Sequence, residues 1–352
     1  MITLTQQQRQ VVDAFAHLRS GERKQFNVGG HAGTGKSVII DAIVREYGDD
    51  VTVCTPTGKA AHVLRSKGVE HACTVHSLLY RPVLNKGTLD FVGRSIARIP
   101  LMIVDEASML SARLVRDIKK KTSAVMFIGD HGQLGPIGDD PGLMSDLDIR
   151  LEHIHRQAAG SPIIQFASHV RAGHLPETCG DLARVQYGGT SDLDSFDVVI
   201  CGFNRSRVEL NAWIRRRRGF TGRLPQVDEQ VICLRNDSDR QVWNGMTGVV
   251  IEVDAEHMRL SVDTDDGPRT DMSFDPLQFG ATSTLPYPTG KRSKVQRTLW
   301  DWGYAITCHK SQGSEWGRVA VKEEIAPTWS AERWRYTAAT RASQELRWVM
   351  PT

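Results

Sequence analysis

The sequence of 352 residues lacks several features that would assign it to a protein class at once. It has no run of about 18 apolar residues, so no membrane span is expected. Polar residues at Gln6, Gln7 and Gln8 stand where a signal peptide would carry its apolar segment. The six cysteines never form a C-x-x-C pair, which argues against a zinc site or a disulfide framework. We therefore expect a cytoplasmic protein with reduced thiols.

Net charge is nearly absent as well. The 44 Lys and Arg residues oppose 41 Asp and Glu residues, so the formal charge is only +3. This balance excludes the overall basic excess of a protein that coats DNA without specificity. The hydrophobic content of 40% and charged content of 24% are typical of a soluble globular protein. The length predicts two or three domains, and the function has to be sought in the motifs.

Short apolar runs alternate with helical patterns over residues 1–150, which predicts a parallel α/β sheet. The expected elements are strands at Gln25–Val28, Val51–Thr55, Leu101–Val104 and Val125–Gly129 and helices at Lys36–Arg45 and Ser108–Val115. A second α/β segment is expected in residues 151–225 and 295–352. Its predicted elements are strands at Val198–Cys201, Tyr304–Thr307 and Leu346–Val349 and a helix at Arg205–Arg217.

Two insertions interrupt this pattern. Residues 226–294 hold short β segments at Val231–Leu234, Gly248–Asp254 and Arg259–Asp263, separated by Asn-Gly and Asp-Gly turns. We predict a small β-barrel here. Residues 81–98 resemble a β-hairpin with an Asn-Lys-Gly turn and a single aromatic residue, Phe91.

Residues 30–37 match the pattern G-x-x-x-x-G-K-[ST] of phosphate-binding loops. The glycines let backbone N–H groups face phosphate oxygens, and the following helix adds the positive end of its dipole. The position between a predicted strand and a predicted helix favours this interpretation over an ordinary glycine turn. In such loops the lysine contacts the β- and γ-phosphates and the hydroxyl binds Mg²⁺. The predicted ATP-binding residues are Gly30, Gly33, Thr34, Gly35, Lys36 and Ser37.

Asp105 and Glu106 follow an apolar strand. Alone, such a pair is as consistent with the start of a helix as with catalysis. With the phosphate loop upstream, we predict that Asp105 binds Mg²⁺ and that Glu106 orients or deprotonates the attacking water. Adjacent carboxylates suit hydrolysis because one neutralises the metal while the other serves water.

Several segments along the chain carry a resemblance to one family. They are Leu4–Val12, the phosphate loop, Thr55–Ala61, Thr74–Ser77, Asp105–Ser108, Gly129–Leu134, His155–Gln157, Gly303–Trp316 and Tyr336–Ala342. Together they resemble the motifs of superfamily 1 helicases, most closely the RecD/Dda branch (superfamily 1B), which moves 5′→3′ on single-stranded DNA. The family usually has proline where this chain has His131, and Leu134-Gly135-Pro136 replaces a more usual Leu-Pro-Pro. No long extension precedes Leu4 and the inserted barrel is short, so we expect the compact Dda type.

The resemblance implies an α/β fold of two RecA-like P-loop NTPase cores. Residues 1–150 would form domain 1A, with 81–98 as a β-hairpin pin (1B). Residues 151–225 and 295–352 would form domain 2A, and 226–294 an inserted SH3-like domain 2B. ATP would lie between the cores with Mg²⁺. The implied nucleotide contacts are Gln8 with adenine, Gln133, Arg156 and the arginine finger Arg341 with the γ-phosphate, and Gly313 and Glu315 elsewhere on the nucleotide.

Single-stranded DNA would cross both cores in this scheme. The implied contacts are Thr55, Pro56, Thr74, His76, Thr307 and His309, with Phe91 stacking on a base at the fork. Each of these polar side chains could instead make an ordinary strand-end hydrogen bond, and Thr55 and Thr307 could be simple caps. Phe91 could anchor the hairpin to the core. Local donors along such a track would explain how a chain of charge +3 grips DNA.

Three other features leave their interpretation open. Arg215–Arg218 ends a predicted helix, where four positive charges favour the negative end of the dipole, so a solvated helix end is the preferred interpretation. Lys291–Lys294 is either a DNA contact or a linker. The tryptophans after residue 299 are expected to pack the second core rather than stack on bases.

The expected function is that of a monomeric ATP-dependent 5′→3′ DNA helicase that translocates on single-stranded DNA and unwinds duplex DNA, in a bacterial or phage-infected cell. Its partners would be single-stranded DNA, single-strand/duplex junctions and ATP, with a single-strand-binding protein or replication and recombination proteins as further candidates. Three alternatives stay open: a DNA-stimulated translocase that displaces proteins with little unwinding, an inactive DNA clamp switched by ATP, and a small-molecule phosphotransferase.

Overall fold

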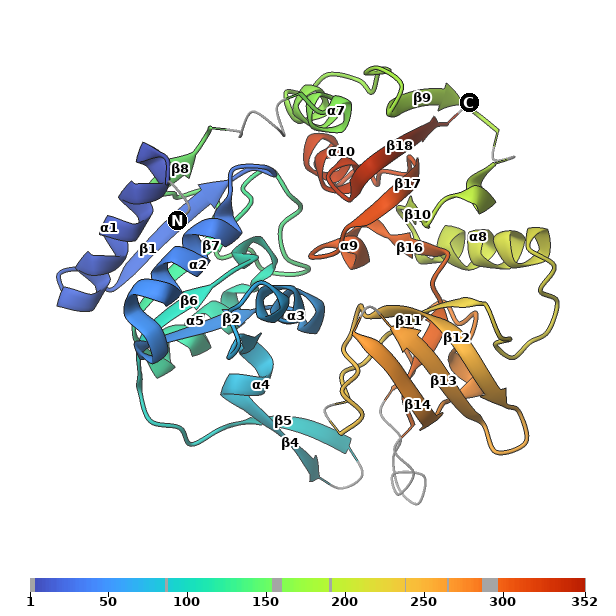
Figure 1. Ribbon diagram of the computed structural model, residues 1–352, viewed down its shortest axis with the longest axis horizontal. Helices are drawn as coiled ribbons and strands as arrows, with labels where there is room; N and C mark the ends of the chain where they lie inside the picture. The colour runs from blue at the N-terminus through green and yellow to red at the C-terminus, as the bar shows by residue number, and fades with distance from the viewer. Residues whose placement is uncertain are drawn as a thin grey trace. The chain divides into compact units, whose positions relative to one another are not determined.

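The computed structural model describes residues 4–85, 88–153, 160–189, 192–237, 239–264, 266–286 and 297–351 (Figure 1). The chain divides into two compact units. The first contains Met1–Val83 and Phe91–Gln165, and the second contains Leu84–Asp90 and Phe166–Thr352. Among the described residues, no helix is both long enough and apolar enough to cross a membrane.

The first unit is built on a six-stranded sheet in the order β3-β2-β6-β7-β1-β8, with every pairing parallel. The strands are β1 (Gln25–Gly30), β2 (Val51–Thr55), β3 (Cys73–Thr74), β6 (Ile99–Val104), β7 (Thr122–Gly129) and β8 (Ile149–Leu151). All four strands predicted from apolar runs are present. The short strands β3 and β8 carry too few residues to give a pattern in the sequence.

Alternate residues of the central strands enter two separate cores, one on each face of the sheet. In β7, Met126 and Ile128 pack in the core that contains residues of α1 and α2, whereas Val125 and Phe127 pack in the core with α4 and α5. The helices of this unit are α1 (Gln6–Ser20), α2 (Lys36–Tyr47), α3 (Gly58–Ser66), α4 (Val75–Leu79) and α5 (Ala112–Lys121). Burial on both faces explains why these strands are continuous apolar runs.

The helix expected at Ser108–Val115 begins later than predicted. A 3₁₀ turn at Ala107–Met109 follows the acidic pair, and α5 begins at Ala112. Glu106 has φ of 53°, a left-handed conformation that no helix can continue. The acidic pair therefore precedes a single 3₁₀ turn and does not start an α-helix.

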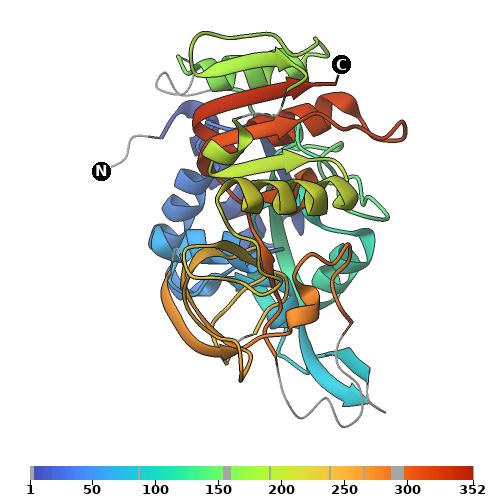
Figure 2. The same ribbon diagram turned by 90° about the vertical axis from the view of Figure 1, so that its right-hand side faces the viewer.

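The second unit contains a five-stranded parallel sheet in the order β16-β10-β17-β18-β9. Figure 2 shows β10, β17, β18 and β9 lying side by side. The strands are β9 (Ala183–Tyr187), β10 (Val198–Cys201), β16 (Ala305–Thr307), β17 (Trp316–Lys322) and β18 (Ala342–Met350). The division between the units falls within α7 (Pro162–Arg171), and the later helices are α8 (Asn204–Arg217), α9 (Cys308–Ser311) and α10 (Ala331–Ala339). Burial of Trp334 and Trp348 confirms that tryptophans pack this core.

A five-stranded antiparallel sheet is inserted between α8 and β16, in the order β14-β13-β12-β11-β15. Its strands are β11 (Gln230–Cys233), β12 (Thr247–Asp254), β13 (Arg259–Thr264), β14 (Gly267–Ser273) and β15 (Trp300–Trp302). β15 lies beyond residue 294, so the antiparallel sheet extends past the end predicted for the inserted β-barrel. Three residues, Trp-Asp-Trp, are too few to show a period of two, and only their pairing with β11 identifies them as a strand.

The predicted hairpin is present as β4 (Tyr80–Asn85) paired with β5 (Thr88–Gly93). Lys86 and Gly87 of the expected turn lie outside the described residues. Phe91 is 48% exposed, so it is not buried in the core as an anchor.

The arginine run at the end of α8 is only partly solvated, which corrects the sequence-based interpretation. Arg216, Arg217 and Arg218 are exposed, but Arg215 is buried. Its guanidinium forms two hydrogen bonds to the carboxylate of Glu229, of 2.5 and 2.9 Å, and stacks over the ring of Trp302 at 3.9 Å. Arg215 therefore ties α8 to the antiparallel sheet. The basic run at Lys291–Lys294 lies outside the described residues.

Candidate nucleotide site

The phosphate loop connects the carboxyl end of β1 to the first residue of α2, as the motif predicts. Gly33 and Gly35 have φ of 80° and 78°, a backbone region in which other residues are strained. At Gly30, a Cβ atom would come within 2.6 Å of Thr34 Oγ1. Each of these positions therefore requires glycine, for its backbone angle or for space.

Lys36 lies against the loop that precedes it. Its Nζ donates to the carbonyl oxygens of Gly30 at 2.7 Å and His31 at 3.1 Å. Thr34 Oγ1 also donates to the His31 carbonyl, at 2.8 Å. Ser37 follows in the first turn of α2, half-buried. The lysine charge is thus held at the mouth of the loop, where phosphates would compete for it.

Gln8 connects α1 to the same loop. Its side-chain amide accepts from the backbone N of Thr5 at 2.9 Å, completing a capping box, and donates to the carbonyl of Thr34 at 3.2 Å. The predicted adenine contact is therefore placed beside the phosphate loop, although both ends of its amide already bind protein groups.

The acidic pair stands at the end of β6. Asp105 is 9% exposed, and burial, together with the charge of Glu106, raises its pKa to about 7 although Lys36 opposes the shift. Among the described residues, Glu106 Oε2, Ser108 Oγ and Gln133 Oε1 are buried without a hydrogen-bond partner. Buried polar atoms of this kind are costly unless a ligand satisfies them. Carboxylates, a hydroxyl and an amide at one sheet edge fit the hydrated Mg²⁺ ion of a nucleoside triphosphate.

Asp105→Asn is expected to raise the thermal stability of the ligand-free protein at pH 8. An unfolded aspartate titrates near 3.8 and the folded one at about 7. Between these values the folded chain keeps a proton that the unfolded chain loses, so this residue lowers stability as pH rises. Melting temperatures of both proteins at pH 5 and pH 8 check this. The advantage of the variant should be larger at pH 8, and an equal difference at both pH values would contradict the assignment.

Asp130 and Gln133 follow β7, the strand between β6 and β1. Asp130 is fully buried; its carboxylate accepts from the backbone N of Gly132 at 2.9 Å and from Gln133 Nε2 at 3.4 Å. Burial alone would raise the pKa of Asp130, but the charge of Lys36 and the hydrogen bond with His31 hold it well below its ordinary value. Asp130 therefore carries a negative charge between the loop and Gln133.

The predicted residues of the second half form a separate group. Arg341 is buried, which rules out an ordinary surface arginine; its guanidinium donates to the carbonyls of Thr337 and Ser314 and to the hydroxyl of Thr340. Gly313 has φ of 73°, and Glu315 is exposed. These two residues flank Ser314, so the hydrogen bond from Arg341 to the Ser314 carbonyl links the arginine to the segment predicted to contact the nucleotide. Arg156 lies outside the described residues.

The predicted DNA contacts differ in their accessibility. Thr55 is fully buried and donates to the carbonyl of Thr57 at 2.7 Å, and Thr74 caps α4 by accepting from Ser77 N. Both hydroxyls therefore make strand-end hydrogen bonds in this structure, and only that of Thr74 caps a helix. The more accessible members of the set are His76, which is exposed, and Pro56, Thr307 and His309, which are half-buried.

An aromatic group beside His309 was not predicted as a site. Trp329, expected to pack the core, is half-buried; its ring contacts that of His309 edge-on at 5.1 Å and stacks with Phe203 at 5.4 Å. Phe203 is 43% exposed. No sequence pattern joins these three residues, because they come together only through the parallel sheet of the second unit.

A glycine loop between a parallel strand and a helix, with Lys36 at its mouth and Asp105 on a nearby strand, defines a P-loop nucleotide-binding protein. A family model described as an AAA domain matches residues 3–188, more than half of the chain, and one described as a UvrD-like helicase C-terminal domain matches residues 303–349. The chain belongs to this AAA-domain family, within the RecD/Dda/Pif1-like group of superfamily 1B.

Individual relatives agree with this placement. The chain is 30% identical over 380 residues to the ATP-dependent RecD2 DNA helicase of Deinococcus radiodurans, an alignment that covers 96% of this chain and 48% of that protein. It is 26% identical over 190 residues to the ATP-dependent DNA helicase dda of Enterobacteria phage T4, covering 48% and 43%. The chain thus spans about half the length, or less, of these relatives.

Solved structures share the fold. The structure of Bacteroides Pif1 bound to single-stranded DNA superposes with a TM-score of 0.63 at 19% identity, covering 99% of this chain and 92% of that one. The Pif1 helicase from Candida albicans gives a TM-score of 0.59 at 19% identity, covering 99% and 94%. The α/β architecture with parallel sheets is therefore that of the Pif1 helicases.

Proposed function

We propose that this chain is an ATP-dependent DNA helicase that moves 5′→3′ on single-stranded DNA and unwinds duplexes. The observation that carries the proposal is the gathering of Lys36, Asp105 and Gln133 around the phosphate loop, in a chain whose family includes named DNA helicases. Lys36 and Gln133 both interact with the carboxylate of Asp130, Lys36 through its charge and Gln133 through a hydrogen bond. Because both side chains interact with the same carboxylate, a phosphate that binds one of them would also affect the other.

In the nucleotide site, Ser37 and Asp105 would hold Mg²⁺, which supplies neutralising charge to the phosphates. Glu106 would orient the attacking water through its unpaired Oε2 atom, and Gln133 would meet the γ-phosphate through its unpaired Oε1 atom. Arg156 and Arg341 would stabilise the charge that develops on that phosphate. Gly313 and Glu315 would contact the nucleotide, and Gln8 the adenine.

Gln133 is the residue best placed to pass a signal onward. Its backbone N donates to the carbonyl of Asp130 and its side chain to the carboxylate, so a shift of Gln133 toward a phosphate would pull on the segment after β7. That segment contacts β1 and the loop, because His131 lies beside Gly29 and the Asp130 carboxylate interacts with His31. Hydrolysis would therefore be coupled to a change at the edge of the sheet.

The domain roles follow the same scheme. Residues 1–150 would be the RecA-like domain 1A, 151–225 with 295–352 domain 2A, and 226–294, extended by β15, an SH3-like domain 2B. The hairpin within 81–98 would be the pin that separates strands, with exposed Phe91 stacking on a base.

The DNA track would use accessible polar and aromatic groups. His76, Thr307 and His309 would contact phosphates, with the backbone around Thr55, Pro56 and Thr74 completing the track. Trp329 and Phe203, which lie beside His309, add a surface on which bases could stack.

Strand displacement from tailed duplexes tests the proposed function. Wild-type protein with ATP and Mg²⁺ should release the labelled strand of a duplex with a 5′ single-stranded tail and leave a 3′-tailed duplex intact. Release only from 3′ tails would refute the direction, and hydrolysis without release from either would favour a translocase that does not unwind. A blunt duplex is the matched substrate control.

Phe91→Ala is expected to reduce strand displacement about 5-fold or more while ATP hydrolysis on single-stranded DNA changes little. Loss of one base-stacking contact costs roughly 1–3 kcal/mol, and that contact would act only at the fork. Tyr187→Ala, which removes a 74% exposed aromatic ring at the end of β9, is the control and should leave both rates unchanged. Equal loss of displacement and hydrolysis in Phe91→Ala would show that Phe91 supports the fold and is not the pin.

A further inference from the structure

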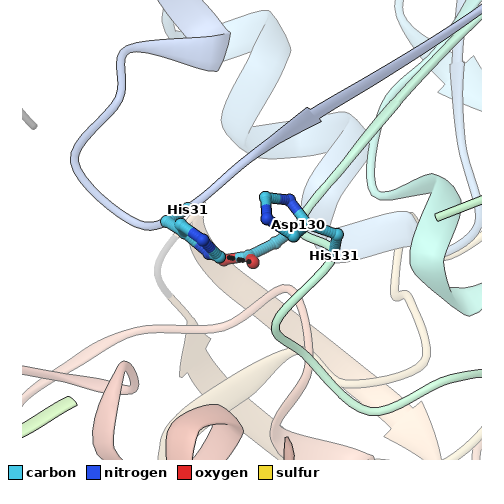
Figure 3. A group of neighbouring side chains, drawn as sticks. All are labelled: His31, Asp130 and His131. Atoms are coloured by element: carbon cyan, nitrogen blue, oxygen red, sulfur yellow. Dashed lines mark hydrogen bonds and ion pairs between the residues drawn. The ribbon is translucent and has the colours of Figure 1, made fainter. Parts of the chain in front are cut away.

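Two histidines and an aspartate, contributed by two segments of the chain, meet at the phosphate loop (Figure 3). His31 belongs to the loop itself, and Asp130 and His131 follow β7. One nitrogen or oxygen atom from each lies within 4.8 Å of the other two. Within the described part of the chain, no other group of three His, Cys, Asp or Glu side chains has this spacing.

The geometry of this cluster is close to that of a metal site. His31 Nδ1 lies 3.3 Å from Asp130 Oδ1, and the two imidazole rings are 4.0 Å apart at 42°. Ligand atoms bound at about 2.0–2.2 Å in a tetrahedral zinc site are about 3.3–3.6 Å from one another. The distance between His31 Nδ1 and Asp130 Oδ1 therefore already matches the spacing of two zinc ligands. Small rotations of the half-buried imidazoles, moving nitrogens by about 1.5 Å or less, would bring the third ligand into range.

The donor set selects the class of ion. Two imidazoles and one carboxylate suit zinc and similar divalent transition ions, whereas Mg²⁺ prefers oxygen ligands. Asp130 is fully buried and its carboxylate is oriented by the backbone N of Gly132, a support of the kind that metal ligands have. The nearby charge of Lys36 opposes a cation, so binding should be reversible.

We propose that His31, Asp130 and His131 bind a divalent ion of the zinc class, and that the bound ion slows ATP hydrolysis. Binding of the ion does not depend on the proposed function, whereas its effect on ATP hydrolysis rests on that function. The ion would fix His31, whose carbonyl holds Lys36 and Thr34, to Asp130, whose carboxylate holds Gln133. The phosphate loop and Gln133, the proposed contact to the γ-phosphate, would then no longer move independently.

Calorimetric titration of the metal-stripped full chain with Zn²⁺ tests the site. One ion should bind per chain, with at least about 10-fold weaker affinity in His31→Ala and in His131→Ala. His131→Asn, which keeps a polar side chain, should weaken binding as well and guards against misfolding of the alanine variant. Co²⁺ in place of Zn²⁺ should give visible absorption that the same variants lose.

Two control variants remove ligand atoms from two other groups among the described residues. His169 stacks on His174 and approaches Glu177 at 3.3 Å, and Cys54 and Cys73 have sulfur atoms 3.5 Å apart. His169→Ala and Cys73→Ser should bind Zn²⁺ as the wild type does. Unchanged binding in His131→Ala, or binding lost in either control, would overturn the site.

ATP hydrolysis measured with and without Zn²⁺, at saturating Mg²⁺ and ATP, tests whether the bound ion slows the reaction. Each protein is compared with itself. The wild type should slow on addition of Zn²⁺ and recover with a chelator, whereas His131→Ala should respond at least about 10-fold less sensitively. Zn²⁺ binding without any effect on an active enzyme would overturn the inhibitory role. Zn²⁺ binding to a chain that hydrolyses no ATP would leave the site standing and refute the proposed function instead.

Discussion

Lys36→Ala is expected to lower the rate of ATP hydrolysis by about 10²–10³-fold, the loss typical of a fixed group that stabilises transition-state charge. Lys36 Nζ is held by the carbonyls of Gly30 and His31 at the mouth of the phosphate loop. Alanine removes that charge and leaves the two carbonyls facing the phosphates. Steady-state hydrolysis at saturating ATP and Mg²⁺ measures the effect.

Folding has to be separated from catalysis in this experiment. Lys36 is half-buried and only its Nζ makes the two bonds, so the melting temperature should change little. Lys24→Ala is the matched control, because Lys24 is exposed and precedes β1, the strand that leads into the loop. It should hydrolyse ATP at the wild-type rate. A Lys36→Ala protein retaining half of the wild-type rate would contradict the nucleotide site described above.

Glu229→Ala is expected to destabilise the second unit by about 3–5 kcal/mol, because it leaves the charge of Arg215 buried without a partner. The carboxylate of Glu229 is fully buried, binds Arg215 through both oxygens, and accepts from the backbone N of Gln226 at 2.9 Å. Urea unfolding followed by tryptophan fluorescence measures the loss. All eight tryptophans lie between Trp213 and Trp348, so the signal reports on this unit.

Two comparison proteins sharpen this result. Arg216→Ala removes an exposed neighbour of the same helix and should change the free energy of unfolding by no more than about 0.5 kcal/mol. The double variant Arg215→Met with Glu229→Leu removes both charges and should lose less than Glu229→Ala alone. A loss under about 1 kcal/mol in Glu229→Ala would show that the pair is not buried in solution.

The nucleotide site could be predicted from sequence because its parts are local. The glycine loop, Lys36 and Ser37 lie within eight residues, and Asp105 follows an apolar run that is continuous because both faces of its strand are buried. Central strands of the first sheet were found for the same reason. Short edge strands such as β3 and β8 gave no pattern.

Features that depend on tertiary contacts could not be predicted. Arg215 is indistinguishable in sequence from Arg216, and only the position of Glu229, fourteen residues later and on a different element, decides which one is buried. His31 occupies a variable position of the phosphate motif, and its approach to His131 follows from the pairing of β1 with β7. The sequence predicts Trp329 in the core because tryptophan is usually buried, but its ring is only half-buried and contacts His309.

ATP hydrolysis measured with and without single-stranded DNA decides whether this nucleotide site drives a DNA motor. A single-stranded oligonucleotide of mixed sequence is titrated into wild-type protein at saturating ATP and Mg²⁺, with Lys36→Ala as the blank. The rate should rise at least about 10-fold and saturate with DNA, because a motor hydrolyses ATP productively only on its track. A wild-type rate that does not respond to DNA would contradict it.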